Sequence, residues 1–130
     1  LSAADNITLP LRLSHTKVDK EWFDHITGML GITERLGHKP SQMSGGQQQR
    51  VAVARALVTR PDVIVADEPT GALDSEASGD LLTFLRHCVD DLGQTVVMVT
   101  HDHDAAARAD DIVTVTDGQV STARSQEALA

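Results

Sequence analysis

The chain has 130 residues, 19 of them acidic and 11 basic, and its formal net charge of -8 argues against a nucleic-acid-binding surface, which needs clustered lysine and arginine. Aromatic residues make up only 2% of the chain, which leaves no stacking platform for single-stranded nucleic acid. A single cysteine, Cys88, suits a reducing compartment, and no stretch approaches the ~20 apolar residues that cross a bilayer.

Two helices are expected before Pro61. Leu1 to Leu13 mixes apolar and turn residues, and Pro10 is expected to interrupt any helix that runs through it. Val18 to Leu30 carries apolar residues at helical spacing and predicts an amphipathic helix. Gly45 to Arg60 is rich in glutamine and alanine and predicts a second helix that ends before the proline.

Beyond Pro61, strands and helices alternate. The expected elements are a strand at 63–66, a helix at 75–92, a strand at 95–99, a strand at 112–115 and a short strand near 119–121. The first run is four residues long and entirely apolar, which suits a strand buried on both faces, as in a parallel sheet. Strand, helix and strand in this order predict an α/β fold with right-handed crossovers.

Two acids, Asp67 and Glu68, follow the first strand directly. Ligands of open α/β sheets bind at the carboxyl ends of the strands. In a phosphoryl-transfer site, an aspartate here would help to hold Mg²⁺, and a glutamate would orient and deprotonate the attacking water. Pro69 is expected to keep the backbone at Glu68 extended. Without context, two acids after a strand are more often solvated loop residues.

The second strand is followed by Thr100, His101, Asp102, His103 and Asp104. They have three interpretations. In the first, all of them are surface loop residues. Alternatively, His101 is a polar switch that reaches a phosphate, while Asp102 to Asp104 cap the next helix. The third interpretation is a metal cluster, since imidazoles and carboxylates bind Zn, Mn or Fe.

A further candidate is Ser44-Gly45-Gly46-Gln47, which precedes a helix. It offers a hydroxyl, two permissive backbones and bare N–H groups, which suit an anion such as a terminal phosphate. The alternative is an ordinary N-cap serine followed by flexible glycines. Asp74 has the same alternative, as the N-cap of the helix that begins at Ser75.

In their residues and in their order along the chain, these segments resemble the ATP-binding-cassette (ABC) family over nearly the whole chain. Met43 to Arg50 is similar to the signature motif, with methionine where leucine is usual, and Val63 to Thr70 to the Walker B segment. Gly71 to Asp74 resembles the D-loop, and Thr100 to Asp102 the switch histidine. The resemblance implies part of a RecA-like P-loop NTPase with a parallel sheet. It assigns residues 1–60 to a helical subdomain and 61–130 to the C-terminal part of the ATPase core.

The resemblance also implies an ATPase that uses ATP and Mg²⁺. Asp67 would bind Mg²⁺ through water, Glu68 would be the general base, and His101 would contact the γ-phosphate. In a head-to-tail dimer, Asp74 would lie at the interface, and four residues would press on the γ-phosphate held by the second subunit: Ser44, Gly45, Gly46 and Gln47. The partner would be a membrane permease, with the ATPase peripheral on the cytoplasmic face. The sequences of the signature-like and D-loop-like segments are most similar to those of ATPases of lipoprotein-release, macrolide-export and antimicrobial-peptide-resistance transporters.

The phosphate loop of this family, Gly-x-x-x-x-Gly-Lys-Ser/Thr, is absent, since none of the three lysines follows a glycine. Leu1 to Asn6 resembles the stretch just after the family's Q-loop, so the chain looks like a truncated fragment that is inactive alone. In the family fold, the missing strand lies between the strand ending at His101 and the strand at 112–115. Its loss predicts a gap with two unpaired edges, and hence self-association or a rearranged sheet.

Two other functions stay open. One is a soluble ABC ATPase of DNA repair or translation, although the compact segment 5–41, without a long coiled coil, resembles the subdomain that docks on permeases. The other is a non-catalytic interaction module, or a metal-binding protein that uses the cluster at 101–104.

Overall fold

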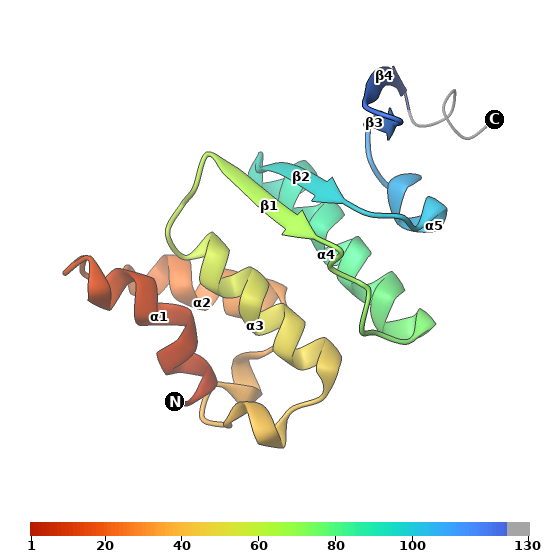
Figure 1. Cartoon of the computed structure of the whole chain (residues 1–130). Coiled ribbons are helices and arrows are strands. Elements are labelled where there is room, and N and C mark those ends of the chain that lie inside the picture. Colours follow the sequence, from red (N-terminus) through yellow and green to blue (C-terminus); the bar gives the residue numbers. More distant parts are fainter. Residues whose placement is uncertain (125–130) are drawn as a thin grey trace.

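The computed structural model describes residues 1–124 and has an α/β fold, as the sequence predicts (Figure 1). Three helices come first and two pairs of strands follow. In chain order the elements are α1 (Ala3–Leu13), α2 (Lys20–Met29), η1 (Thr33–Arg35), η2 (Pro40–Gln42), α3 (Gly45–Leu57), β1 (Val63–Asp67), α4 (Ser75–Leu92), β2 (Thr95–Val99), α5 (His103–Ala106), β3 (Asp111–Thr116) and β4 (Gln119–Arg124).

Helix α1 was not expected, because Pro10 lies within it. Proline cannot donate the usual hydrogen bond to the carbonyl four residues earlier, which destabilises a helix interior. Two features offset this loss. Ser2 and Asp5 form a capping box at the start of the helix. In addition, a buried stripe that includes Ile7 and Leu11 packs in the core beside α3. The prediction that Pro10 interrupts the helix is therefore wrong.

The other long helices begin and end close to where the sequence predicts. Asp19 caps α2, and α4 spans the predicted residues, ending at Gly93 in the left-handed conformation (φ +67). Helix α3 begins at Gly45 as predicted but ends at Leu57, three residues early. Its end is fixed by Arg60, whose φ of +52 cannot continue a helix.

The hydrophobic core lies mainly among α1, α2 and α3. Its largest fully buried side chains here are Ile7, Ile26, Leu30, Ile32 and Leu57, and Ile64 of β1 and Cys88 of α4 join the same cluster. Burial raises the pKa of the Cys88 thiol to about 11, so this cysteine is a packed, protonated side chain at neutral pH.

The strands form two separate two-stranded sheets. β1 and β2 are parallel, with Val63 opposite Thr95 and Asp67 opposite Val99, whereas β3 and β4 form an antiparallel hairpin. Among residues 1–124, β2 and β3 share no ladder, and Figure 1 shows the hairpin standing apart from β1 and β2. The expected gap is present, and no rearranged pairing closes it. Self-association of the chain stays a prediction.

β1 and β2 are covered on one face only, which corrects the expectation of strands buried on both faces. Ile64 of β1 is 7% exposed, whereas Val65 is 70%, Val97 49% and Val99 51% exposed. Helix α4 lies against one side of the strands (Figure 1), and no described element covers the other. A short apolar run specifies a strand, but it does not tell what packs on either side.

Within residues 1–124, no helix has both the length and the apolar character needed to span a membrane.

Candidate functional site

Two groups of the predicted site residues gather at different places, and the first lies at the carboxyl ends of β1 and β2. Because the strands are parallel and in register, Asp67 and Glu68 emerge beside Thr100 and His101. The backbone N–H of His101 donates to Glu68 Oε1 at 3.0 Å, and the Thr100 hydroxyl lies 3.4 Å from Glu68 Oε2. Asp67, Glu68 and His101 therefore share one edge of the sheet, as the sequence predicts.

The backbone at Glu68 is not extended, contrary to the expectation from Pro69. Glu68 has a φ of +46, a region that non-glycine residues occupy at a cost of about 1–3 kcal/mol. Three contacts hold it there: its N–H donates to the Val99 carbonyl at 2.7 Å, its carbonyl accepts from the Gly71 N–H at 3.1 Å, and its carboxylate accepts from His101. Cross-strand bonds thus outweigh the local preference of a residue before proline.

The side chains of Asp67 and His101 are exposed, so both can reach a ligand. The Asp67 carboxylate has no hydrogen-bond or ion-pair partner within the described part of the chain. His101 Nε2 lies 3.8 Å from Glu68 Oε1, but the imidazole is 100% exposed, so water screens this pair strongly. The edge therefore holds one free carboxylate beside one anchored carboxylate.

The metal-cluster interpretation of residues 101–104 is wrong. Within residues 1–124, no group of three or more histidine, cysteine or acidic side chains is placed so that it could hold a metal ion. Asp102 caps α5 instead, accepting from the Asp104 N–H at 2.9 Å, as the switch interpretation expects.

Sequence analysis did not single out Thr100 as a site residue. Besides approaching Glu68, its hydroxyl accepts from the Asp102 N–H at 3.0 Å, so it links the glutamate to the start of α5. A hydroxyl residue directly before the switch histidine is the signal that could have identified it.

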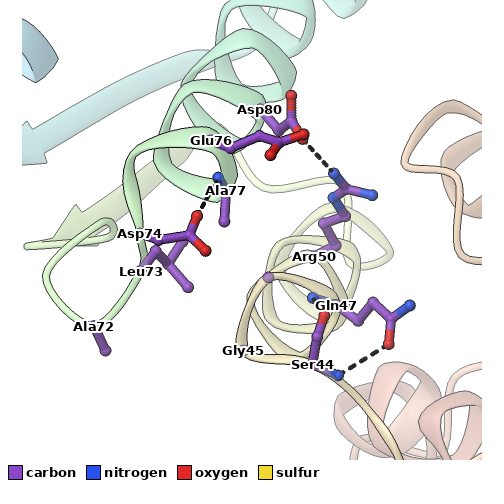
Figure 2. A pocket seen from close by; sticks show the side chains of 11 residues that line it. Ser44, Gly45, Gln47, Arg50, Ala72, Leu73, Asp74, Glu76, Ala77 and Asp80 are labelled. Carbon is purple, nitrogen blue, oxygen red and sulfur yellow. Dashed lines mark hydrogen bonds and ion pairs between the residues drawn. The ribbon is translucent and has the colours of Figure 1, made fainter.

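The second group lines a groove between the starts of α3 and α4 (Figure 2). Ser44, Gly45, Gly46, Gln47 and Arg50 lie on the α3 side. Asp74 lies on the α4 side, together with Ala72, Leu73, Glu76, Ala77 and Asp80. The signature-like and D-loop-like segments therefore face one another.

Ser44 and Gln47 form a capping box at the start of α3. The Ser44 hydroxyl accepts from the Gln47 N–H at 3.1 Å, and Gln47 Oε1 accepts from the Ser44 N–H at 3.0 Å. The N-cap interpretation is thus correct, and this cap still leaves hydrogen-bond donors at the start of α3 without a protein acceptor within residues 1–124. The hydroxyl proton of Ser44 and the N–H groups of Gly45 and Gly46 have no acceptor among the described residues.

Asp74 is the N-cap of α4, accepting from the Ala77 N–H at 2.8 Å. Its second carboxylate oxygen is open to the groove and to solvent, because the residue is exposed. A turn that includes bonds from Gly71 N–H to the Glu68 carbonyl and from Leu73 N–H to the Thr70 carbonyl connects Asp74 to the first group.

Comparison with known proteins agrees with this layout. The family described as ABC transporter matches residues 1–71, which is more than half of the chain. The chain belongs to the ABC transporter family. The match covers the signature-like segment and the whole of β1 with Asp67 and Glu68.

Among the relatives of this ABC chain are two bacterial transporter proteins. It is 47% identical over 122 residues to the macrolide export ATP-binding/permease protein MacB of Burkholderia thailandensis, covering 92% of this chain and 18% of MacB. It is 41% identical over 122 residues to the lipoprotein-releasing system ATP-binding protein LolD of Francisella tularensis subsp. tularensis, covering 92% of this chain and 53% of LolD. The chain thus spans about a fifth of one relative and half of the other.

A solved structure shares the fold. A dimeric ATP-binding cassette in a post-hydrolysis state, bound to ADP and Pi, superposes with a TM-score of 0.76 and 37% sequence identity, covering 95% of this chain and 56% of the cassette. The α/β fold described above is therefore that of an ABC cassette, seen in part.

Proposed function

We propose that this chain is the signature and Walker B part of an ATP-hydrolysing subunit that drives a membrane permease, of the type to which MacB and LolD belong. The observation that carries the proposal is the pairing of Asp67 and Glu68 at the end of β1, with the Glu68 carboxylate held by the end of β2. The likeness to both relatives over 92% of the chain supports the subfamily.

Glu68 is the proposed general base. Its two oxygens accept from the His101 N–H and the Thr100 hydroxyl, and each keeps lone pairs for the proton of an attacking water. The fixed backbone at Glu68 adds precision, because catalytic groups work best when their position is set in advance. His101, exposed beside it, is proposed to contact the γ-phosphate.

Asp67 is the proposed residue for Mg²⁺, acting through water. An exposed carboxylate without a protein partner, beside a second carboxylate, fits a hard cation that prefers oxygen ligands. When bound, the ion supplies charge neutralisation at the phosphates.

Ser44, Gly45, Gly46 and Gln47 are proposed to press on the γ-phosphate of ATP held by a second subunit, in a head-to-tail dimer with Asp74 at the interface. The open hydroxyl proton of Ser44 and the two glycine N–H groups are the donors for this contact. The dimeric form of the similar cassette supports the arrangement.

The remaining assignments follow from the same proposal. Residues 1–60 form the helical subdomain that docks on the permease, and residues 61–130 belong to the ATPase core. The subunit is then peripheral on the cytoplasmic face of the membrane, with ATP as substrate.

The proposal is tested by Glu68→Gln in the complete gene product. The amide keeps the side chain's size but cannot take a proton, so ATP turnover should fall at least 100-fold, in line with the 10²–10⁴ that general-base catalysis contributes. ATP binding, measured by fluorescence titration, should change little. Glu34→Gln, at an exposed glutamate in η1, is the matched control and should hydrolyse ATP normally. Normal turnover by Glu68→Gln would remove the glutamate from the mechanism.

A further inference from the structure

Arg50 makes the only side-chain ion pair or hydrogen bond between α3 and α4 within the described residues. It lies six residues after the Ser44 cap and reaches across the groove of Figure 2. One guanidinium nitrogen lies 3.5 Å from Asp80 Oδ2, and the guanidinium carbon lies 4.4 Å from the centre of the Phe84 ring. Asp80 and Phe84 are four residues apart, so they share one face of α4.

Neither contact would be strong alone, but together they restrict the orientation of the Arg50 guanidinium group. The ion pair is partly solvated, with the Asp80 side chain 55% exposed, and water screens such pairs. The Arg50 side chain is 23% exposed and Phe84 is half-buried, so the stacking contact is the better protected of the two. A flat guanidinium that lies over a ring and pairs with a carboxylate at its edge has few orientations available.

The two helices that Arg50 joins begin at the two loops of the groove. α3 starts after Ser44 and α4 after Asp74. Their starts are also close: a methyl group at Gly45 would lie 3.4 Å from Leu73 Cδ2, and one at Gly46 would lie 3.5 Å from the Ala77 Cβ. A tilt of α3 against α4 would therefore change the spacing between the loops, and Arg50 opposes that tilt.

We infer that Arg50, through Phe84 and Asp80, is a positioning residue that sets the spacing of the signature-like loop and the D-loop-like segment for ATP in the opposite subunit. The use of this spacing for ATP rests on the proposed function. Arg50 itself touches neither the nucleotide nor the reacting atoms.

The first experiment measures the spacing without ATP. Spin labels at Ser41→Cys and Ser75→Cys, two exposed positions, report the distance between the loops by double electron–electron resonance. A label at position 41 reports the movement of α3, because Gln48 Nε2 of this helix donates to the carbonyl of the neighbouring Pro40 at 2.9 Å. The buried Cys88, with its raised pKa, reacts slowly at neutral pH. Arg50→Met should broaden the distance distribution, and Arg50→Lys, which keeps the charge but not the flat group, should broaden it less.

The second experiment measures ATP-dependent dimerisation of the complete gene product in the Glu68→Gln background, by size-exclusion chromatography. Arg50→Met should raise the ATP concentration needed for dimerisation at least tenfold and leave ATP affinity of the monomer within twofold. Arg55→Met, an exposed arginine on the same helix, should change neither measurement. An unchanged label distance together with unchanged dimerisation in Arg50→Met would overturn the inference.

Two other outcomes are also decisive. If Arg50→Met does not fold, Phe84→Leu and Asp80→Asn each remove one half of the contact. Both must weaken dimerisation, and wild-type behaviour of either one overturns the inference. If Glu68→Gln with Arg50 intact does not dimerise on ATP, the proposed function fails, whereas the label distances still decide whether Arg50 sets the spacing.

Discussion

The helical region, residues 3–58, and the strand region, residues 63–124, differ in how much of their apolar side-chain surface is exposed. The helical region buries most of its large apolar residues, with Ile7, Ile26, Leu30 and Leu57 all fully buried and Leu13 at the end of α1 exposed. The strand region leaves apolar side chains in the open: those more than 45% exposed are Val63, Val65, Val97, Val99, Val113, Val115 and Val120. The helices thus satisfy their own hydrophobic pattern, whereas the strands do not.

This difference means that the two groups of proposed site residues are held in place by different interactions. The signature-like loop begins a helix that is packed in the core, so its position depends on side-chain packing. The proposed base, Glu68, follows a strand covered on one face, so its position depends on backbone pairing with β2 and on its own carboxylate contacts. Substitutions in the two regions should therefore have different effects.

The largest effect on stability is expected from Leu57→Ala. Leu57 is 0% exposed in the core that α3 shares with α1 and α2, and truncation of such a leucine costs about 2–5 kcal/mol because it leaves a cavity. Leu13→Ala, at a leucine that is 74% exposed, is the matched control and should cost less than about 0.5 kcal/mol. Equilibrium urea unfolding of the 130-residue chain, followed by circular dichroism, measures both. Equal costs would mean that the helical region is not the stable part of the molecule.

An intermediate effect is expected at the two capping serines, and it separates structure from function. Ser2 and Ser44 form equivalent capping boxes, so replacing either by alanine should cost about 1 kcal/mol of stability. Only Ser44→Ala should also reduce ATP turnover, by roughly 10- to 100-fold, because a hydrogen bond to a charged group is worth about 1.5–3 kcal/mol.

Ser44→Asp sharpens the same comparison. Aspartate caps helices as well as serine does, so stability should be retained, while the added negative charge repels a phosphate. The variant should unfold like the wild type and fail to hydrolyse ATP, as judged by phosphate release from the complete gene product. Full turnover by Ser44→Asp would show that the loop does not meet a phosphate.

The sequence allowed most elements to be predicted because their local signals agree. Helix α4 has a cap at Asp74, a stripe of leucines and a glycine stop, and its predicted bounds are confirmed. Helix α1 was missed because Pro10 was weighed above the Ser2 and Asp5 capping pair, which was equally visible in the sequence. The ends of β1 and β2 could be placed together by the general rule for parallel sheets.

Other features needed the tertiary structure. The left-handed backbone of Glu68 depends on a bond to Val99, 31 positions along the chain, and the local effect of Pro69 pointed the other way. The contact between Arg50 and Phe84 joins two helices whose relative rotation no local pattern specifies. The exposed faces of β1 and β2 were predicted wrongly, since an apolar run is the same whether one face or both are covered.

The smallest effect is expected on the open face of the sheet. Val65→Thr keeps the shape of a β-branched side chain that is 70% exposed, so it should change the free energy of unfolding by less than about 0.5 kcal/mol. Ile64→Thr, one residue earlier and 7% exposed, buries a hydroxyl on the covered face and should cost about 1–3 kcal/mol. If urea unfolding gives the two variants the same cost, the valine face is covered in solution. A second copy of the chain is the expected cover, because the exposed valines of β1 and β2 form an apolar face that favours association. The cost of Val65→Thr should then fall as the chain is diluted, since dilution separates the copies and exposes the valine in the wild type as well.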